Sequence, residues 1–230
     1  KLGSVFSIQN GVMKNAQLAE AFGQDTVLGA IGMLGGAVEA SGAANFMMDN
    51  PIIVGELSGA SSARVDAIVK ALQDAKLSAA ASNAILTEEW TKFVGWLGLS
   101  GLAVLTRQES WKFMADEDGA RMAARIMQET AQLPQHMGIP LKTGPLFTFD
   151  AISSKDQDAL VAFLRRRGEA QSTTAPNFRQ SMLQDVDKGK QFEVEETFGY
   201  VVRKAEELGL SVPTVETCYR ILAGLNRMLQ

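Results

Sequence analysis

The sequence predicts an α/β unit followed by an all-helical unit. Up to residue 57, β-prone apolar runs alternate with glycines and turn signals, which is typical of strands with brief crossovers. From Ser61 onward, apolar residues recur at three- and four-residue spacing, which is typical of amphipathic helices. The pattern changes within residues 76–87, and we place the two predicted domains at residues 1–82 and 83–230.

The first domain is predicted to hold a small sheet. Its elements, in order, are a strand at residues 4–8, a helix at 15–22 closed by Gly23, buried strands at 26–39 and 45–48, and a strand at 51–57. A sheet of this size leaves an edge and a face uncovered. We therefore expect this domain to be the second part of a larger one, and the chain to be a fragment.

The helical part is predicted from periodicity and from its breakers. Its helices are expected at residues 62–74, 87–105, 118–137, 154–167, 193–208 and 215–229. The second begins with the acidic residues Glu88 and Glu89, which suit a first turn. Ser153 or Ser154 is expected to cap the fourth, which ends at Gly168.

Composition excludes several classes of function. The net charge is 22 − 26 = −4 with a pI near 5.2, which argues against a nucleic-acid partner. A single cysteine, Cys218, cannot form an internal disulfide and suits a reducing compartment. With one histidine, His136, the chain cannot build a His/Cys metal site, so no metal is expected.

No targeting or membrane segment is predicted. The chain opens without a signal-peptide apolar core. Residues 26–48 form the most apolar window, but five glycines and Glu39 argue against a membrane span. We expect a cytoplasmic protein with no membrane partner.

Lys92 is the first candidate for chemistry. It lies among Trp90, Phe93 and Trp96 on the most apolar predicted helix. Burial lowers the pKa of a lysine, which makes the ammonium a competent general acid near neutral pH. The alternative is a lysine whose stem packs on the tryptophans while its ammonium stays in water, and spacing alone favours this alternative.

The same helix carries Gly95, Gly98 and Gly101. Glycine costs roughly 1 kcal/mol in a helix interior, so three glycines on one helix need a reason. Either a ligand or another backbone approaches closely there, and close helix packing is at least as plausible.

Asn10 is the second candidate. Gln9, Asn10 and Gly11 follow a predicted strand, at the end of a strand where α/β sheets bind ligands. An asparagine side chain offers a donor and an acceptor to such a ligand. The alternative is an Asn-Gly hairpin turn, which the local pattern alone favours.

Ser181 and Glu193 lie in a polar stretch between two predicted helices. Ser181 could cap a helix, with Gln184 completing a capping box, or present its hydroxyl to an anionic ligand. Glu193 could equally be only a first-turn acid. Glycine-rich phosphate loops of the G-x-G-x-x-G or G-x-x-x-x-G-K-S/T type are absent from the sequence.

Taken in order, these segments resemble the ketopantoate reductase (2-dehydropantoate 2-reductase) family. The matching segments are IQNGV at residues 8–12, IVGE at 53–56, WxK at 90–92, LAxLT at 102–106, and SMLQD at 181–185, followed by GK at 189–190, Glu193, GY at 199–200, Gly209 and Pro213. The SMLQD segment with its downstream glutamate is the most specific of them.

The resemblance implies NADPH-dependent reduction of a 2-oxo acid to a 2-hydroxy acid, on the route to pantothenate and coenzyme A. It implies that residues 1–82 are the C-terminal part of a Rossmann-type NADP-binding domain. Residues 83–230 would then be a helical substrate-binding and catalytic domain like the C-terminal domain of 6-phosphogluconate dehydrogenase. A homodimer is also expected.

The resemblance also implies roles for individual residues. Lys92 would be the general acid, and Glu193 would bind the substrate hydroxyl and orient Lys92. Asn10 would lie near the nicotinamide and the substrate, and Ser181 would bind the substrate carboxylate.

Two departures from the family pattern matter. Family members often carry asparagines four and eight residues after the lysine, where this chain has Trp96 and Ser100. Ser100 is still a candidate substrate ligand, but Trp96 would fill much of any pocket that it faced. The family's glycine-rich fingerprint precedes the Gln-Asn-Gly element, and only eight residues precede that element here. We expect this chain alone not to bind NADPH tightly.

Two alternatives remain open. The chain could be a non-catalytic helical dimerisation module, with a glycine-dense helix and ten methionines serving self-association. It could also be a related dehydrogenase that acts on a different 2-oxo acid, or one of the 6-phosphogluconate or 3-hydroxyacyl type.

Overall fold

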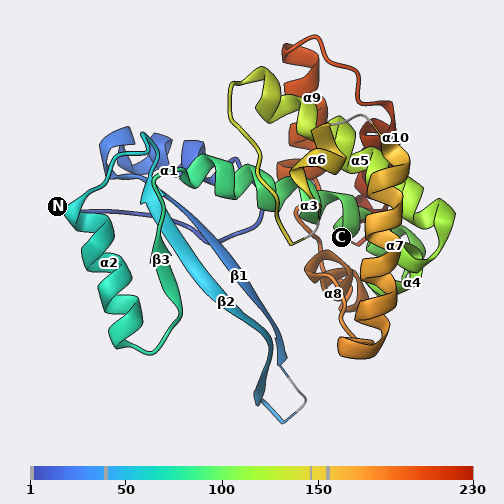
Figure 1. Cartoon of the computed structure of the whole chain (residues 1–230), viewed down its shortest axis with the longest axis horizontal. Coiled ribbons are helices and arrows are strands. Elements are labelled where there is room, and N and C mark those ends of the chain that lie inside the picture. Colours follow the sequence, from blue (N-terminus) through green and yellow to red (C-terminus); the bar gives the residue numbers. More distant parts are fainter. Residues whose placement is uncertain (1–2, 39–40, 146, 154–155, 230) are drawn as a thin grey trace. The chain divides into compact units, whose positions relative to one another are not determined.

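The structure, a computed structural model, describes residues 3–38, 41–145, 147–153 and 156–229 (Figure 1). The chain divides into two compact units, Lys1–Glu89 and Trp90–Gln230. The division falls inside helix α3 (Ile85–Thr106), whereas the sequence pattern placed it after residue 82. The first unit is α/β with a three-stranded sheet, and the second is helical.

The sheet is built on one long antiparallel hairpin. Strand β1 (Leu28–Val38) pairs with β2 (Ala44–Glu56), and the short β3 (Ala79–Ala81) pairs in parallel with β2. The predicted strands at residues 45–48 and 51–57 are one strand, and a hairpin replaces the expected crossover. Pro51 does not break β2 because the register shifts opposite it, between Gly32 and Leu34.

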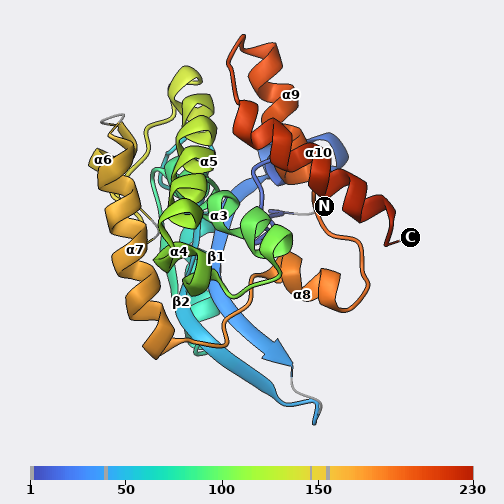
Figure 2. The ribbon, with the colours of Figure 1, turned by 90° about the vertical axis from the view of Figure 1, so that its right-hand side faces the viewer.

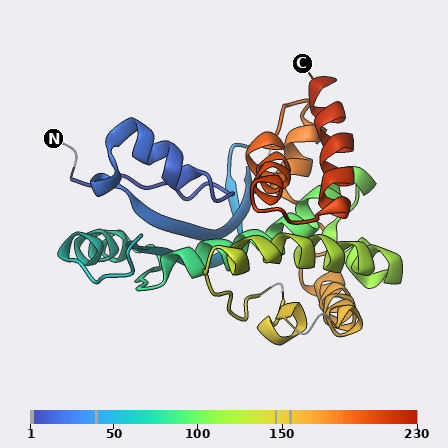
Figure 3. The ribbon, with the colours of Figure 1, turned by 90° about the horizontal axis from the view of Figure 1, so that it is seen from above.

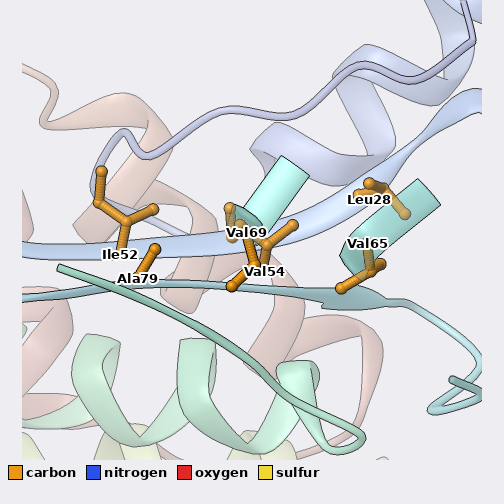
Figure 4. Close-up of a cluster of buried hydrophobic side chains, with 7 residues drawn as sticks. Leu28, Ile52, Val54, Val65, Val69 and Ala79 are labelled. Carbon is orange, nitrogen blue, oxygen red and sulfur yellow. The ribbon is translucent and has the colours of Figure 1, made fainter. Parts of the chain in front are cut away.

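The core of this unit lies between the sheet and helix α2 (Ala63–Asp74). The helix begins one residue later than predicted, because Ser62 is its N-cap: the Ser62 hydroxyl accepts a hydrogen bond from the amide of Val65. Figure 4 shows its side chains over the strands. The buried cluster consists of Leu28, Ala30, Ile52, Val54, Val65, Val69 and Ala79. Helix α1 (Lys14–Phe22) ends as predicted at Gly23, whose φ is +88°, and lies across the hairpin from α2 (Figure 3).

The predicted strand at residues 4–8 is reduced to a single bridge. Val5 pairs in parallel with Val27, just after the short 3-10 turn η1 (Gln24–Thr26). A β-strand requires consecutive residues that pair with a neighbouring strand, and within the described residues this segment forms a single bridge. The segment then bends at Asn10 and Gly11 and enters α1. The hairpin interpretation of Asn10 and Gly11 is therefore wrong, because a helix follows the bend.

The second unit is built of helices (Figure 2). After α3 they are α4 (Ser110–Ala115), α5 (Glu117–His136), α6 (Phe149–Ser153), α7 (Gln157–Thr174), α8 (Ser181–Asp187), the π-helical turn η2 (Glu195–Gly199), α9 (Tyr200–Glu207) and α10 (Pro213–Arg227). Helix α7 packs on α4 and α5. None of the helices in the described ranges is long and apolar enough to cross a membrane.

Helix α7 differs from its prediction at both ends. Its N-cap is Asp156, whose side chain accepts from the amides of the first turn, and not Ser153, which belongs to α6; Ser154 lies outside the described residues. The helix runs through Gly168 instead of ending there. A Cβ at Gly168 would lie 2.6 Å from the backbone nitrogen of Ala115, so this glycine allows α4 and α7 to pack closely.

Helix α10 begins at Pro213, earlier than predicted, and a buried carboxylate satisfies its first amides. Glu129 of α5 accepts hydrogen bonds from the amides of Thr214 and Val215, each 2.9 Å from its Oε2. An anion at a helix N-terminus is stabilised by the amides and by the helix dipole. The contact ties α10 to α5.

Candidate active site

Helix α3 presents Lys92 from an otherwise buried segment. Residues 93–104 are all buried, whereas Lys92 is partly exposed. This exposure is compatible both with a desolvated general acid and with a lysine whose ammonium stays in water. The helix nevertheless gives Lys92 a fixed backbone position.

Aromatic side chains surround this part of α3. The Phe93 ring contacts Trp90 edge-on at a centroid distance of 5.7 Å and stacks on Trp96 at 6.4 Å. Trp90 also meets Tyr200 of α9 at 6.3 Å, and burial raises the pKa of the Tyr200 phenol. Such ring contacts hold the helix around Lys92 against the rest of its unit.

The glycines of α3 serve helix packing where the structure describes their surroundings. A Cβ at Gly98 would lie 2.5 Å from Met127 of α5, and a Cβ at Gly101 would lie 2.3 Å from the Phe198 ring of η2. The packing interpretation is therefore confirmed for these two positions, because neighbouring side chains fill the space that a ligand would need.

Ser100 is completely buried on the same helix. Its hydroxyl donates to the carbonyl oxygen of Leu97 at 3.5 Å, one turn earlier. This contact gives the hydroxyl a local acceptor. A role for Ser100 as a substrate ligand remains a prediction.

Ser181 is exposed and is the first residue of α8, so the predicted capping role is wrong. The N-cap is Gln180, whose backbone is extended with ψ 148°, while Ser181 is already helical. Gln184 does not close a capping box, because its side-chain amide donates to the carbonyl oxygen of Arg179 at 2.9 Å. The Ser181 hydroxyl therefore does not serve as the helix cap.

The two residues before Ser181 are tied to the start of α4. Gln180 Nε2 donates to Ser110 Oγ at 3.0 Å, and both side chains are buried. Arg179 pairs with Glu109 at 2.8 Å and with Asp187 at 2.8 Å. Sequence reasoning missed these contacts, because they join segments far apart in the chain and no local pattern marks them.

Glu109 is the acidic centre of this tie. The pKa of Glu109 is lowered to about 2. The hydrogen bond from Lys112 is the largest cause, and the hydrogen bond from Arg179 lowers the pKa further. The carboxylate is therefore ionised at neutral pH and holds Arg179 in place.

Glu193 lies in a bend two residues before the π-helical turn η2 and is half-buried. Its carbonyl oxygen accepts a short hydrogen bond from the hydroxyl of Thr197, a fully buried residue. Single π-helical turns occur frequently at functional sites. The predicted helix at 193–208 thus begins later, and Glu193 is not a first-turn acid of α9.

Asn10 belongs to the first unit, whereas the other four candidates belong to the second. The carbonyl oxygen of Gly11 accepts from Lys14 Nζ at 3.1 Å. Lys14 also forms a buried ion pair with Glu89 at 3.1 Å. No local pattern marks this pair, because Glu89 follows the ordinary pattern of a first-turn acid.

Within the described part of the chain, no group of three or more His, Cys, Asp or Glu residues could hold a metal ion. The five candidate residues carry one amine, one carboxamide, two hydroxyl groups and one carboxylate. An amine of this kind can donate a proton, and hydroxyl and carboxamide groups can donate hydrogen bonds to a small anion.

Comparison with known proteins adds the family. Residues 84–226 match the family model described as "Ketopantoate reductase PanE/ApbA C terminal". The 2-dehydropantoate 2-reductase of Archaeoglobus fulgidus is 28% identical over 223 residues, which cover 97% of this chain and 68% of that protein.

Two solved structures share the fold. A dimeric ketopantoate reductase from Staphylococcus aureus is 17% identical with a TM-score of 0.73, over 99% of this chain and 69% of that one. A complex of D-mandelate dehydrogenase with NADH is 16% identical with a TM-score of 0.79, over 99% and 71%. This chain thus spans about two thirds of the length of these proteins. The matched residues include α3, α8 and η2, and the chain belongs to the ketopantoate reductase family of oxidoreductases through its C-terminal domain.

Proposed function

We propose that this chain is the substrate-binding and catalytic part of an NADPH-dependent reductase that converts a 2-oxo acid to a 2-hydroxy acid. The observation that carries the proposal is the position of Lys92. Lys92 is a partly exposed residue in an otherwise buried stretch of α3, inside the segment that matches the family. The 2-dehydropantoate named for the Archaeoglobus relative is the first substrate to test.

The bound cofactor would supply the hydride that reaches the carbonyl carbon of the substrate. Lys92 donates a proton from its ammonium to the carbonyl oxygen, which completes the hydroxyl group. The Glu193 carboxylate accepts a hydrogen bond from the hydroxyl group that the substrate already carries, and it orients the Lys92 ammonium. A general acid and a partner of opposite charge are what carbonyl reduction requires of the protein.

The remaining candidates bind. The hydroxyl of the exposed residue Ser181 donates to the substrate carboxylate. Ser100, two turns after Lys92 on α3, is a second ligand of the substrate. Asn10 binds where the nicotinamide and the substrate meet. We further propose that residues 83–230 are a domain of the 6-phosphogluconate dehydrogenase C-terminal type.

The described residues of the first unit fit the nicotinamide end of such a cofactor. Asn15 Oδ1 is buried without a hydrogen-bond partner among these residues, and a carboxamide N–H is the kind of donor it lacks. The sequence contains no glycine-rich phosphate loop, so we expect tight NADPH binding to need residues outside this chain. Because D-mandelate dehydrogenase was solved with NADH, both nucleotides belong in the test.

A second candidate substrate class is favoured by Trp96. It lies one turn after Lys92, on the same face of α3, and its indole stacks on Phe93. An apolar ring at this position favours a 2-oxo acid with an apolar side chain over one with a hydroxymethyl group. The cytoplasmic location and the homodimer stay predictions, and the dimeric Staphylococcus aureus relative supports the latter.

The test is oxidation of NADPH and of NADH by the full-length protein, with 2-dehydropantoate and then a panel of apolar 2-oxo acids. Turnover of any of them, with one 2-hydroxy acid formed per nucleotide oxidised, is the expected result. Lys70→Ala is a suitable control, because Lys70 lies exposed on α2 and should leave turnover unchanged. Nucleotide binding without turnover of any 2-oxo acid would contradict the proposal.

A further inference from the structure

The first unit contains a buried ion pair that the proposed reaction does not use. Lys14 of α1 and Glu89 of α3 are 5% and 3% exposed, and Lys14 Nζ lies 3.1 Å from Glu89 Oε1. Lysine and glutamate are almost never buried to this extent unless they are paired. Both residues lie in the same unit, 75 positions apart along the chain counted from 14 to 89.

Glu89 uses both carboxylate oxygens. Its Oε1 also accepts from the amide of Ala30 in β1 at 3.1 Å, and its Oε2 accepts from Asn15 Nδ2 at 2.6 Å. One carboxylate of α3 therefore joins the first turn of α1 and the beginning of β1 to its own helix. With three donors, it has the partners that a buried anion requires.

Lys14 has a second acceptor, and this acceptor is next to a candidate site residue. Its Nζ donates to the carbonyl oxygen of Gly11 at 3.1 Å. Gly11 has a φ of +87°, a conformation that other residues rarely adopt. The ammonium thus links the Glu89 carboxylate to the bend that contains Asn10.

Stability alone does not account for this arrangement. Replacing a buried ion pair by well-packed neutral residues is often neutral or stabilising, because burying two charges removes their hydration. A role in fixing the geometry of a loop would explain why a buried ion pair is present at these two positions.

We propose that Lys14 and Glu89 are positioning residues, which together hold the Asn10–Gly11 bend in the conformation that binds the nicotinamide and the substrate. The inference rests on the proposed function and deepens it. Glu89 fixes the Lys14 ammonium, and the ammonium fixes the Gly11 carbonyl group. That carbonyl group belongs to the peptide linking Gly11 to Val12, so the contact fixes the C-terminal side of the bend that contains Asn10.

The test compares variants of the full-length protein. Lys14→Met leaves the Glu89 carboxylate buried without its counter-ion, and Glu89→Gln leaves the Lys14 ammonium buried without its counter-ion. The double variant Lys14→Met/Glu89→Gln removes both charges of the pair. Melting temperature, the Kd for NADPH and the kinetic constants are measured for each. We expect the single variants to melt at lower temperature and the double variant to recover most of that loss.

Catalysis should not recover with stability. In the double variant, assayed well below its melting temperature, we expect kcat/KM to remain about tenfold below wild type and NADPH to bind more weakly, because the Gly11 carbonyl group has lost its donor. Arg64→Met is the matched control. It breaks the Arg64–Glu56 ion pair, which joins α2 to β2 in the same unit, and should lower the melting temperature without changing kcat/KM or Kd.

A double variant with wild-type kcat/KM and wild-type affinity for NADPH would overturn the inference, because the pair would then be structural only. A wild-type enzyme that reduces no 2-oxo acid would instead overturn the proposed function. The two failures are distinguishable, because the first requires an active wild type.

Discussion

Gln180 and Ser110 are 70 residues apart in the sequence, and the side-chain amide of Gln180 donates to the Ser110 hydroxyl at 3.0 Å. Both side chains are buried. The bond ties the start of α8 to the start of α4, and Ser181 is the residue that follows. The position of the proposed carboxylate-binding hydroxyl thus depends on a segment far away in the chain.

Gln180→Leu should therefore raise KM for the 2-oxo acid more than it lowers kcat. The substitution keeps the volume but removes the donor, and loss of one buried hydrogen bond costs about 1 kcal/mol of stability. Steady-state kinetics and chemical denaturation measure the two effects. The control is Gln17→Leu on the exposed face of α1, and a Gln180→Leu enzyme with an unchanged KM would contradict this prediction.

Stability should depend on the ionisation of Glu109. Its pKa is about 2 in the folded protein, chiefly because Lys112 donates to it, against a value of 4.5 for an ordinary glutamate. Between pH 4.5 and 2 the unfolded chain binds more protons at this group than the folded chain, so its contribution to stability is present above this window and is lost as pH falls through it.

Thermal unfolding of wild type and Glu109→Gln from pH 6 to pH 2 measures this contribution. The difference in melting temperature between the two proteins should shrink as pH falls, because other carboxyl groups titrate alike in both. A difference that stays constant over the whole range would show that Glu109 does not contribute in this way.

Cys218 should be unreactive in the folded protein. Burial raises the pKa of its thiol to about 11, and the nearby Glu129 carboxylate adds to the shift. Since the thiolate is the reactive form, almost none is present at pH 8. Titration with a thiol reagent should give no reaction in buffer and one thiol per chain in denaturant. Rapid labelling of the native protein would contradict the buried position.

Gly168→Ala should destabilise the second unit, although alanine is the better helix former. The new Cβ would lie 2.6 Å from the backbone of Ala115, and overpacking costs about 1–3 kcal/mol. Gly224→Ala on α10 is the matched control, because its nearest neighbour is the flexible end of Arg227 at 4.0 Å. The control should gain up to about 1 kcal/mol. Equal denaturation midpoints for the two variants would contradict the packing described here.

Local patterns were enough to predict the elements whose signals lie within one segment. Helix α2 begins at Ala63, within one residue of its prediction, α1 ends before Gly23 and α5 ends before Gly138, as the spacing of apolar residues and glycines indicates. The division into an α/β part and a helical part follows from the same periodicities, since strand and helix repeats differ.

Features that depend on tertiary contacts were not predictable in this way. Gly168 is typical of a helix stop, but α4 packs against it and the helix continues. Pro51 is typical of a strand boundary, but a register shift accommodates it in β2. The ties from Glu109 to Arg179 and from Lys14 to Glu89 join distant segments, so no window of the sequence contains them. The roles of Lys92, Glu193, Asn10, Ser181 and Ser100 remain predictions.

The most direct test of the account is single-turnover reduction of the 2-oxo acid by Lys92→Ala in the full-length protein. Loss of a general acid should slow the chemical step by about 10²- to 10⁴-fold while NADPH binding and the melting temperature stay near wild type. That result would place Lys92 at the proton transfer. A Lys92→Ala enzyme that reduces the substrate at the wild-type rate would contradict the central claim.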